Sequence, residues 1–282
     1  MIELDEFPVL VDPVMVAAFE GWNDAGESAS GAIAHLREVW DAQPLADLDS
    51  EEYYDYQVNR PMISLDETGV RSLTWPATRI YVARIPLFPR DLVLVQGIEP
   101  NMKWQQFVRE ILGLAAELDV STVITLGALL SDIPHSRPVP VTGTSSDASL
   151  QSDLGLEASS YEGPTGIVGV LQDACTRFGI SAVSLWAAVP HYVAQPPCPK
   201  ATLALVRRIE DILDVPVPLG DLVEEARAWE VGVDELAADD EEVAEYVKQL
   251  EEARDAVDLP EASGEAIARE FERYLRRRGT QS

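Results

Sequence analysis

The sequence is poor in cysteine and in positive charge. Its two Cys cannot build a disulfide framework, and neither belongs to a Cys-x-x-Cys pair for zinc. Lys and Arg together number 21 against 49 Asp and Glu, which gives a formal net charge of −28. Because a surface this negative repels phosphate backbones and anionic lipid headgroups, we expect neither nucleic acid nor a membrane as a partner.

Long hydrophobic runs are also missing. No apolar stretch approaches the ~20 residues that span a bilayer. Residues 1–6 contain no cationic region followed by an apolar run, so we expect a cytoplasmic protein without a secretory signal. What the chain does have is an ordinary globular composition, with 282 residues of which 46% are hydrophobic and 25% charged. This composition excludes wholesale disorder and suits one large domain or a core with a smaller appendage.

Short apolar runs alternate with helical patterns along most of the chain. The runs have the character of strands buried on both faces. They are residues 9–19, 79–86, 91–96, 120–127, 139–143 and 180–188. Apolar residues at helical spacing fill 25–40, 104–118, 167–178 and 200–213. This alternation predicts an α/β fold with a mostly parallel sheet covered by helices on both faces.

One segment interrupts the alternation. Residues 51–60 and 69–75 are two β-rich pieces joined by a polar loop, and we predict that they form a β-hairpin inserted at about 51–75. Its aromatic residues are Tyr53, Tyr54, Tyr56 and Trp75. An isolated ribbon cannot bury so many rings, so they either pack on the parent domain or form a subunit contact.

The composition changes after residue 218, where we place a boundary between an α/β core (1–218) and a helical domain (219–282). Residues 221–261 contain 16 acidic and 3 basic side chains. Helices are predicted at 222–237, 241–257 and 266–278. The negative charge fits either a solvated face or a mobile lid over whatever the core binds.

The carboxyl ends of parallel strands are where an open α/β sheet binds its ligands. We therefore expect a ligand pocket lined by the polar and aromatic residues that follow the predicted strands. These residues are Glu20, Trp22, Asn23, Asp24, Glu99, His191 and Tyr192. Asn23 and Asp24 also have a structural alternative, because either side chain can cap a helix that opens at Ala25.

Motifs for catalysis are weak around these positions. His135 and His191 both follow strands, where an imidazole can move protons, and Ser145, His191 and Asp24 can be drawn as a triad. However, no Gly-x-Ser-x-Gly elbow supports the serine as a nucleophile. The histidines and carboxylates lack the spacing of metal ligands, so we expect no metal and no cofactor.

Three motifs together carry a family resemblance. They are Glu20-Gly-Trp-Asn-Asp-Ala-Gly26, Glu162-Gly-Pro-Thr-Gly166 and Ser184-Leu-Trp-Ala-Ala-Val-Pro-His-Tyr192. Over residues 10–215 the chain resembles the prokaryotic, long bacterial-type members of the second proteasome assembly chaperone family. The resemblance implies a three-layer α/β/α sandwich with a core similar to purine nucleoside phosphorylases and peptidyl-tRNA hydrolases. It implies no established reaction, although eukaryotic relatives help to assemble proteasome rings.

Two functions stay open at this point. The first is a non-catalytic ligand-binding or assembly protein on an enzyme-like core, with a small molecule or a peptide as ligand. The second is an enzyme of the nucleosidase, phosphorylase or amide-hydrolase type, with Glu20 or Asp24 as base and His191 as proton donor. A phosphorylase needs a cationic phosphate site, for which the strand exits offer only Arg137 and Lys103. We also expect a homo-oligomer, and by analogy with phosphorylase-like cores a trimer rather than a dimer.

Overall fold

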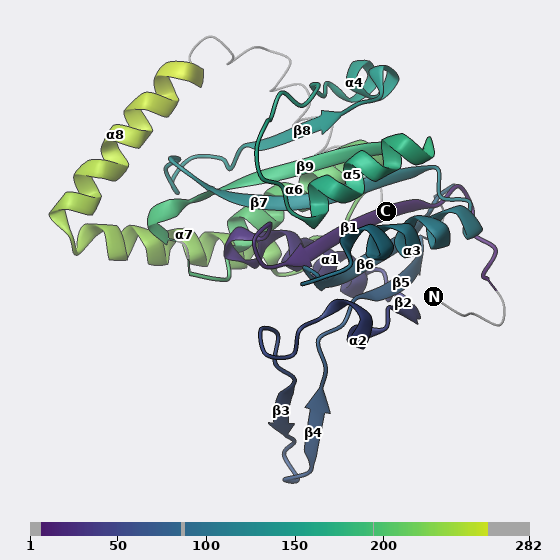
Figure 1. The fold of residues 1–282 in the computed structure, drawn as a ribbon. Coiled ribbons are helices and arrows are strands. Elements are labelled where there is room, and N and C mark those ends of the chain that lie inside the picture. Colours follow the sequence, from purple (N-terminus) through teal and green to yellow (C-terminus); the bar gives the residue numbers. More distant parts are fainter. Residues whose placement is uncertain (1–6, 86–87, 194, 259–282) are drawn as a thin grey trace, which may run out of the picture.

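The computed structural model describes residues 7–85, 88–193 and 195–258, which form an α/β fold around a seven-stranded sheet (Figure 1). The order of the strands across this sheet is β2-β5-β6-β1-β7-β9-β8. In chain order they are β1 (Val14–Glu20), β2 (Gln43–Asp47), β5 (Arg79–Arg84), β6 (Asp91–Ile98), β7 (Thr122–Ser131), β8 (Val141–Ser145) and β9 (Ser181–Pro190).

The sheet is mixed, whereas the sequence predicted a mostly parallel one. The central strands β6, β1, β7 and β9 run parallel as expected, but β2, β5 and β8 pair antiparallel with their neighbours. The link between β5 and β6 is too short for the helical crossover that a parallel pair requires. The alternation along β1 explains its apolar run, because Val16 and Ala18 face one hydrophobic cluster while Met15, Ala17 and Phe19 face the other.

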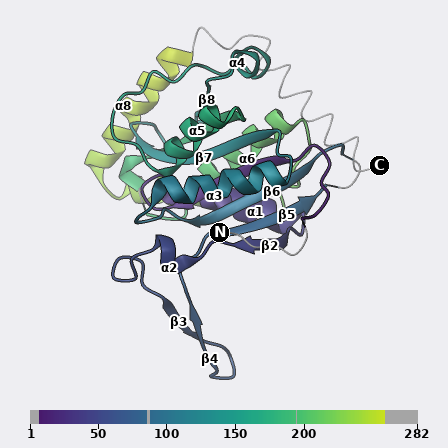
Figure 2. The same cartoon turned by 45° about the vertical axis from the view of Figure 1, so that its right-hand side comes forward.

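Helices cover both faces of the sheet (Figure 2). α1 (Ser28–Val39) and α6 (Pro199–Leu213) pack on one face, and α3 (Trp104–Glu117) and α5 (Ile167–Phe178) pack on the other. All four helices were predicted from the apolar spacing. The first is preceded by a short 3₁₀ turn (Ala25–Glu27), so the α-helix itself begins later than the pattern suggested.

Two elements of the core were not predicted. β2 is an edge strand that contains Pro44, and proline weakens a strand pattern although an edge tolerates it. α4 (Ala148–Leu154) is short, and Asp147 caps its N-terminus by accepting from the Ser149 amide at 2.9 Å. Elements this short or this peripheral leave little periodicity in the sequence.

The predicted hairpin exists, but its first strand lies further along the chain than expected. It consists of β3 (Met62–Leu65) and β4 (Arg71–Thr74). The segment 51–60, predicted as a strand, instead contributes to the helical turn α2 (Ser50–Tyr53). This turn forms because the Asp49 side chain caps its N-terminus, where acidic residues are favoured.

The hairpin aromatics are divided between the core and the base of the ribbon. Tyr53 and Tyr54 are buried in the core cluster beneath α3. Tyr56 and Trp75 pack against each other with ring centroids 4.8 Å apart. The ribbon itself projects away from the sheet (Figures 1 and 2).

Two C-terminal helices complete the described chain, close to their predicted bounds. They are α7 (Leu222–Ala238) and α8 (Glu241–Asp258), while the predicted helix at 266–278 lies outside the described residues. Leu222 and Ala226 pack in the same hydrophobic cluster as α1 and α6. In the part of the chain that the structure describes, no helix has both the length and the apolarity to cross a bilayer.

Candidate functional site at the strand exits

The parallel strands β6, β1, β7 and β9 end at one edge of the sheet, as the ligand-site prediction requires. Glu20 at the end of β1 lies beside Ile98 of β6, and Asp24 forms a bridge with Ala128 of β7. β7 and β9 then continue in register to Ser131 and Pro190. Because β7 and β9 extend further than β1 and β6, the strands end at two levels. We call the loops that follow β1 and β6 the first step, and the loops that follow β7 and β9 the second step.

Asn23 and Glu99 meet at the first step. Asn23 Nδ2 donates to Glu99 Oε1 at 2.7 Å, and the Ile167 amide donates to the same oxygen at 2.8 Å. Glu99 thus places a carboxylate on the N-terminus of α5, where helical amides are free and negative charge is favoured. The third partner is Gly166, because a Cβ there would lie 2.2 Å from Asn23 Oδ1. This contact requires the absence of a side chain at Gly166.

Asp24 has a structural task at the same step. Its Oδ1 accepts from the backbone amides of Ala29 at 2.7 Å and Ser30 at 3.3 Å, so it holds the start of α1. Asp24 Oδ2 is buried and has no hydrogen-bond partner within the described residues. Burial raises the pKa of Asp24, and hydrogen bonds from Ser30 and Ala29 oppose this shift only in part.

Glu20 and Trp22 flank these buried groups. Burial raises the pKa of Glu20, and the neighbouring carboxylates of Asp24 and Glu27 raise it further. The Trp22 side chain, by contrast, is 66% exposed. The first step therefore combines two engaged polar side chains, Asn23 and Asp24, with a carboxyl group and an indole nearer the solvent.

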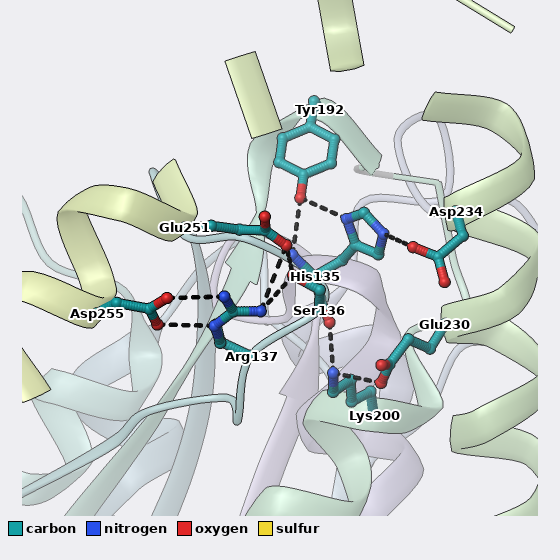
Figure 3. Close-up of polar contacts among 9 residues, drawn as sticks. All are labelled: His135, Ser136, Arg137, Tyr192, Lys200, Glu230, Asp234, Glu251 and Asp255. Atoms are coloured by element: carbon teal, nitrogen blue, oxygen red, sulfur yellow. Dashed lines mark hydrogen bonds and ion pairs between the residues drawn. The ribbon is translucent and has the colours of Figure 1, made fainter. Parts of the chain in front are cut away.

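His135 and Tyr192 meet at the second step (Figure 3). Tyr192 Oη accepts from the His135 backbone amide at 2.7 Å and lies 2.8 Å from His135 Nδ1. The other ring nitrogen of His135, Nε2, lies 2.9 Å from Asp234 Oδ1 of α7, so both ring nitrogens have a polar partner.

Burial keeps the Tyr192 hydroxyl in its protonated form. It raises the pKa of Tyr192 to about 12, which removes phenolate chemistry near neutral pH. The His135 side chain is only 2% exposed. The chain of contacts from Tyr192 through the buried His135 to the exposed Asp234 therefore links the 3₁₀ turn after β9 (His191–Val193), the loop after β7 and α7.

The loop after β7 also holds the C-terminal helices by charge (Figure 3). Arg137 forms two 2.8 Å bonds with Asp255, from Nε to Oδ1 and from Nη2 to Oδ2. Arg137 Nη1 lies 3.4 Å from Glu251 Oε1, which also accepts from the Ser136 hydroxyl. The pKa of Asp255 is lowered because the Arg137 guanidinium donates to it.

Lys200 at the start of α6 makes the next contact. Its Nζ donates to the backbone carbonyl of His135 and to Glu230 Oε2 of α7 at 2.5 Å. Besides Arg137, the sequence predicted Lys103 as a cation near the strand exits. Lys103 is paired with Glu52 of α2 at 2.5 Å. Both cations considered for a phosphate site, Arg137 and Lys103, are thus engaged by carboxylates of the chain itself.

His191 contacts α8 rather than the first step. His191 Nδ1 lies 3.1 Å from Asp132 Oδ1, and the Tyr246 hydroxyl of α8 donates to the same oxygen at 3.3 Å. The rings of His191 and Tyr246 pack edge to face with centroids 5.5 Å apart. Within the described residues no hydrogen bond or ion pair joins His191 to Asp24.

The expected site residues therefore fall into two groups. Asn23, Asp24 and Glu99 lie at the first step, and His191 and Tyr192 lie at the second with the C-terminal helices. The triad drawn from the sequence does not form, because the buried Ser145 hydroxyl donates to the Ala182 carbonyl. Among the described residues no group of three His, Cys, Asp or Glu is placed to hold a metal ion.

Sequence reasoning missed the partners that the C-terminal helices supply. Asp234, Glu251 and Asp255 are ordinary members of an acidic run, and only the fold shows that they face Arg137 and His135. The one signal in the sequence was His135, which follows a predicted strand. A charged residue on a helix gives no indication of which loop it will contact.

Comparison with solved structures supports this architecture. A PAC2 family protein from Streptomyces avermitilis is 63% identical, with a TM-score of 0.79, and the match covers 84% of this chain and 100% of that chain. A Mycobacterium tuberculosis proteasome-assembly chaperone homologue is 56% identical, with a TM-score of 0.76 and coverage of 83% and 99%. An M. tuberculosis protein of unknown function is 31% identical, with a TM-score of 0.83 and coverage of 93% and 91%.

The family model agrees with these structures. No curated protein matches the chain. Residues 18–237 match the model of the PAC2 family, and this range includes both steps of the strand exits, the three motifs and α7 except its last residue. The chain belongs to the PAC2 family.

Proposed function

We propose that the protein binds a ligand at the strand exits and that α7 and α8 form a lid which must open for the ligand to enter. The observation that carries this proposal is the set of contacts from α7 and α8 to the second step, above all those of Arg137 with Asp255 and Glu251. The helices close over the edge of the sheet where ligands bind in parallel α/β folds.

The nature of the contacts supports opening. α8 meets the exits through ion pairs and hydrogen bonds of partly exposed side chains, since Asp255 is 53% exposed and Glu251 28%, and ion pairs in contact with solvent contribute little to stability. α7 is different, since Leu222 and Ala226 anchor it in the hydrophobic core. We therefore place the moving part in α8 and the last turns of α7.

An assembly role belongs to the same proposal. The M. tuberculosis relative is described as a proteasome-assembly chaperone homologue, and a protein segment is one candidate for what the exits bind. The ribbon formed by β3 and β4 supports self-association, because its apolar side chains have no cover within the described chain, and the analogy with phosphorylase-like cores favours a trimer over a dimer. The exposed residues are Met62, Ile63, Leu65, Val70 and Leu73.

Hydrogen exchange tests the lid. In the Arg137→Ala variant we expect the amides of α8 to exchange faster than in the wild type, while those of β1 and β7 keep their protection. Arg177→Ala is the matched control, because Arg177 forms an exposed ion pair on α5 that is unrelated to the lid. Equal protection of α8 in the Arg137→Ala and Arg177→Ala variants would contradict the proposal.

Turnover assays test the enzymatic alternative. The wild type and the Glu20→Gln variant are screened with nucleosides and peptidyl amides, because Glu20 is a carboxyl group of raised pKa near the solvent. The proposal predicts binding without sustained turnover. Sustained turnover that disappears in Glu20→Gln would replace it with a catalytic function.

A further inference from the structure

We propose that Ser136, Arg137 and Lys200 form a recognition site for an oxyanion, a phosphate or carboxylate group of a small ligand. In the closed lid, carboxylates of α7 and α8 occupy this site in place of the ligand. The inference rests on the lid proposed above and adds the chemical class of what displaces it.

Arg137 makes a two-point contact with a carboxylate of the chain itself. The guanidinium meets both oxygens of Asp255 at 2.8 Å, the two-point arrangement by which arginine binds carboxylates and phosphates. The neighbouring Ser136 hydroxyl donates to Glu251, which also lies 3.4 Å from Arg137 Nη1. α8 thus offers the loop two carboxylates where an anionic ligand would offer its own oxygens.

Lys200 supplies a second cation beside the first. Its ammonium donates to the carbonyl of His135, two residues before Arg137, and to Glu230 of α7 (Figure 3). Its side chain is only 14% exposed, so its charge is screened less by solvent than that of a surface lysine. Arg137 and Lys200 are the cations at the second step, and in the closed state carboxylates of α7 and α8 pair with both of them.

Asp255 is more exposed than the arginine that it contacts, which favours its displacement by a ligand. The Asp255 side chain is 53% exposed in the closed state, so its carboxylate returns to water with little change in hydration. Arg137 stays on the core and loses Asp255 and Glu251 when α8 opens, while Lys200 keeps its contact with the His135 carbonyl. An oxyanion that replaces those partners binds only the open state, so its binding shifts the population toward opening.

A double variant tests the site without removing it. Glu251→Gln with Asp255→Asn retains Ser136 and Arg137 but removes the competing charges. In isothermal titration calorimetry at fixed ionic strength, we expect inorganic phosphate or citrate to bind this variant at least about tenfold more tightly than the wild type. Comparing the two probes shows whether the site prefers a phosphate or a carboxylate.

Two further variants make the result specific. Adding Arg137→Ala to the double variant should remove the gain in affinity. Glu235→Gln with Glu252→Gln makes the same change of net charge at exposed positions of α7 and α8, and should leave the affinity at the wild-type value. The proposal is overturned when neither probe gains affinity in the double variant, or when the charge-matched control gains as much.

Hydrogen exchange on the same double variant separates the two proposals. Loss of α8 protection without a gain in anion affinity overturns the anion site and leaves the lid in place. Unchanged α8 protection without a gain in anion affinity contradicts the lid as well. A gain in affinity that depends on Arg137, together with loss of α8 protection, supports both.

Discussion

At the residue scale, the polar side chains Asn23 and Asp24 after β1 form hydrogen bonds within the protein that stabilise the fold. Asn23 and Glu99 were expected to point into one crevice, and the structure joins them directly. The sequence could not show that Glu99 would also hold the α5 amide of Ile167, because that contact joins positions 68 residues apart. Asp24 has a structural role close to the expected one, because its carboxylate accepts from the Ala29 and Ser30 amides in the first turn of α1 instead of capping a helix at Ala25.

At this step, replacement of Gly166 should lower the stability of the protein the most. In Gly166→Ala the new Cβ would meet the Asn23 amide at 2.2–2.7 Å, and we expect a loss of ~1–3 kcal/mol in the free energy of unfolding. Gly113 in α3 has no heavy atom within 4 Å of such a Cβ, so Gly113→Ala should be neutral or stabilising. Urea denaturation of both variants checks this, and equal effects would contradict the packing argument.

The raised pKa of Asp24 predicts a pH dependence of stability. The folded protein binds this proton more tightly than the unfolded chain, whose pKa is near 3.8. The contribution of Asp24 to stability therefore falls as pH rises from that value through the raised folded-state pKa. In Asp24→Asn this fall is absent, so the stability difference, variant minus wild type, should increase with pH. Urea titrations across the window measure it, and a constant difference would refute the shift.

At the scale of elements, the periodicity of apolar residues predicted the long and regular strands and helices. The central strands, α3, α5 and both C-terminal helices follow their apolar patterns closely. The first strand of the hairpin was misplaced because a run of tyrosines has high β-propensity, and the Asp49 cap with burial of Tyr53 prevailed. The attachment of α7 and α8 to the strand exits depends on tertiary contacts that no local pattern encodes.

Two tyrosines at this attachment should respond differently to loss of their hydroxyl groups. In Tyr192→Phe the buried His135 loses the partner of both its amide and Nδ1, which should cost about 1–3 kcal/mol in stability. In Tyr246→Phe only a 3.3 Å bond to Asp132 at the surface is lost, so stability should change little. Chemical denaturation compares them, and equal losses would mean that the His135 contacts are not structural.

At the scale of the whole molecule, the exposed ribbon of β3 and β4 is the feature that a monomer explains least. We expect the wild type to be a trimer at micromolar concentration, and Met62→Ser with Leu65→Ser and Leu73→Ser to be a monomer. Phe178→Ser with Val231→Ser and Leu236→Ser removes comparable exposed apolar groups elsewhere and should leave the trimer intact. Light scattering after gel filtration decides, and a wild-type monomer would contradict the expectation.

The central claim is that α8 closes over the strand exits and is released when its charge contacts weaken. Spin labels at Glu252→Cys on α8 and Gln105→Cys on α3 report this directly, because both native cysteines are buried. We predict one short distance at low ionic strength, and a second, longer distance that grows with salt and dominates in Arg137→Ala. A single unchanged distance at all salt concentrations, in the wild type and in Arg137→Ala alike, would contradict the account.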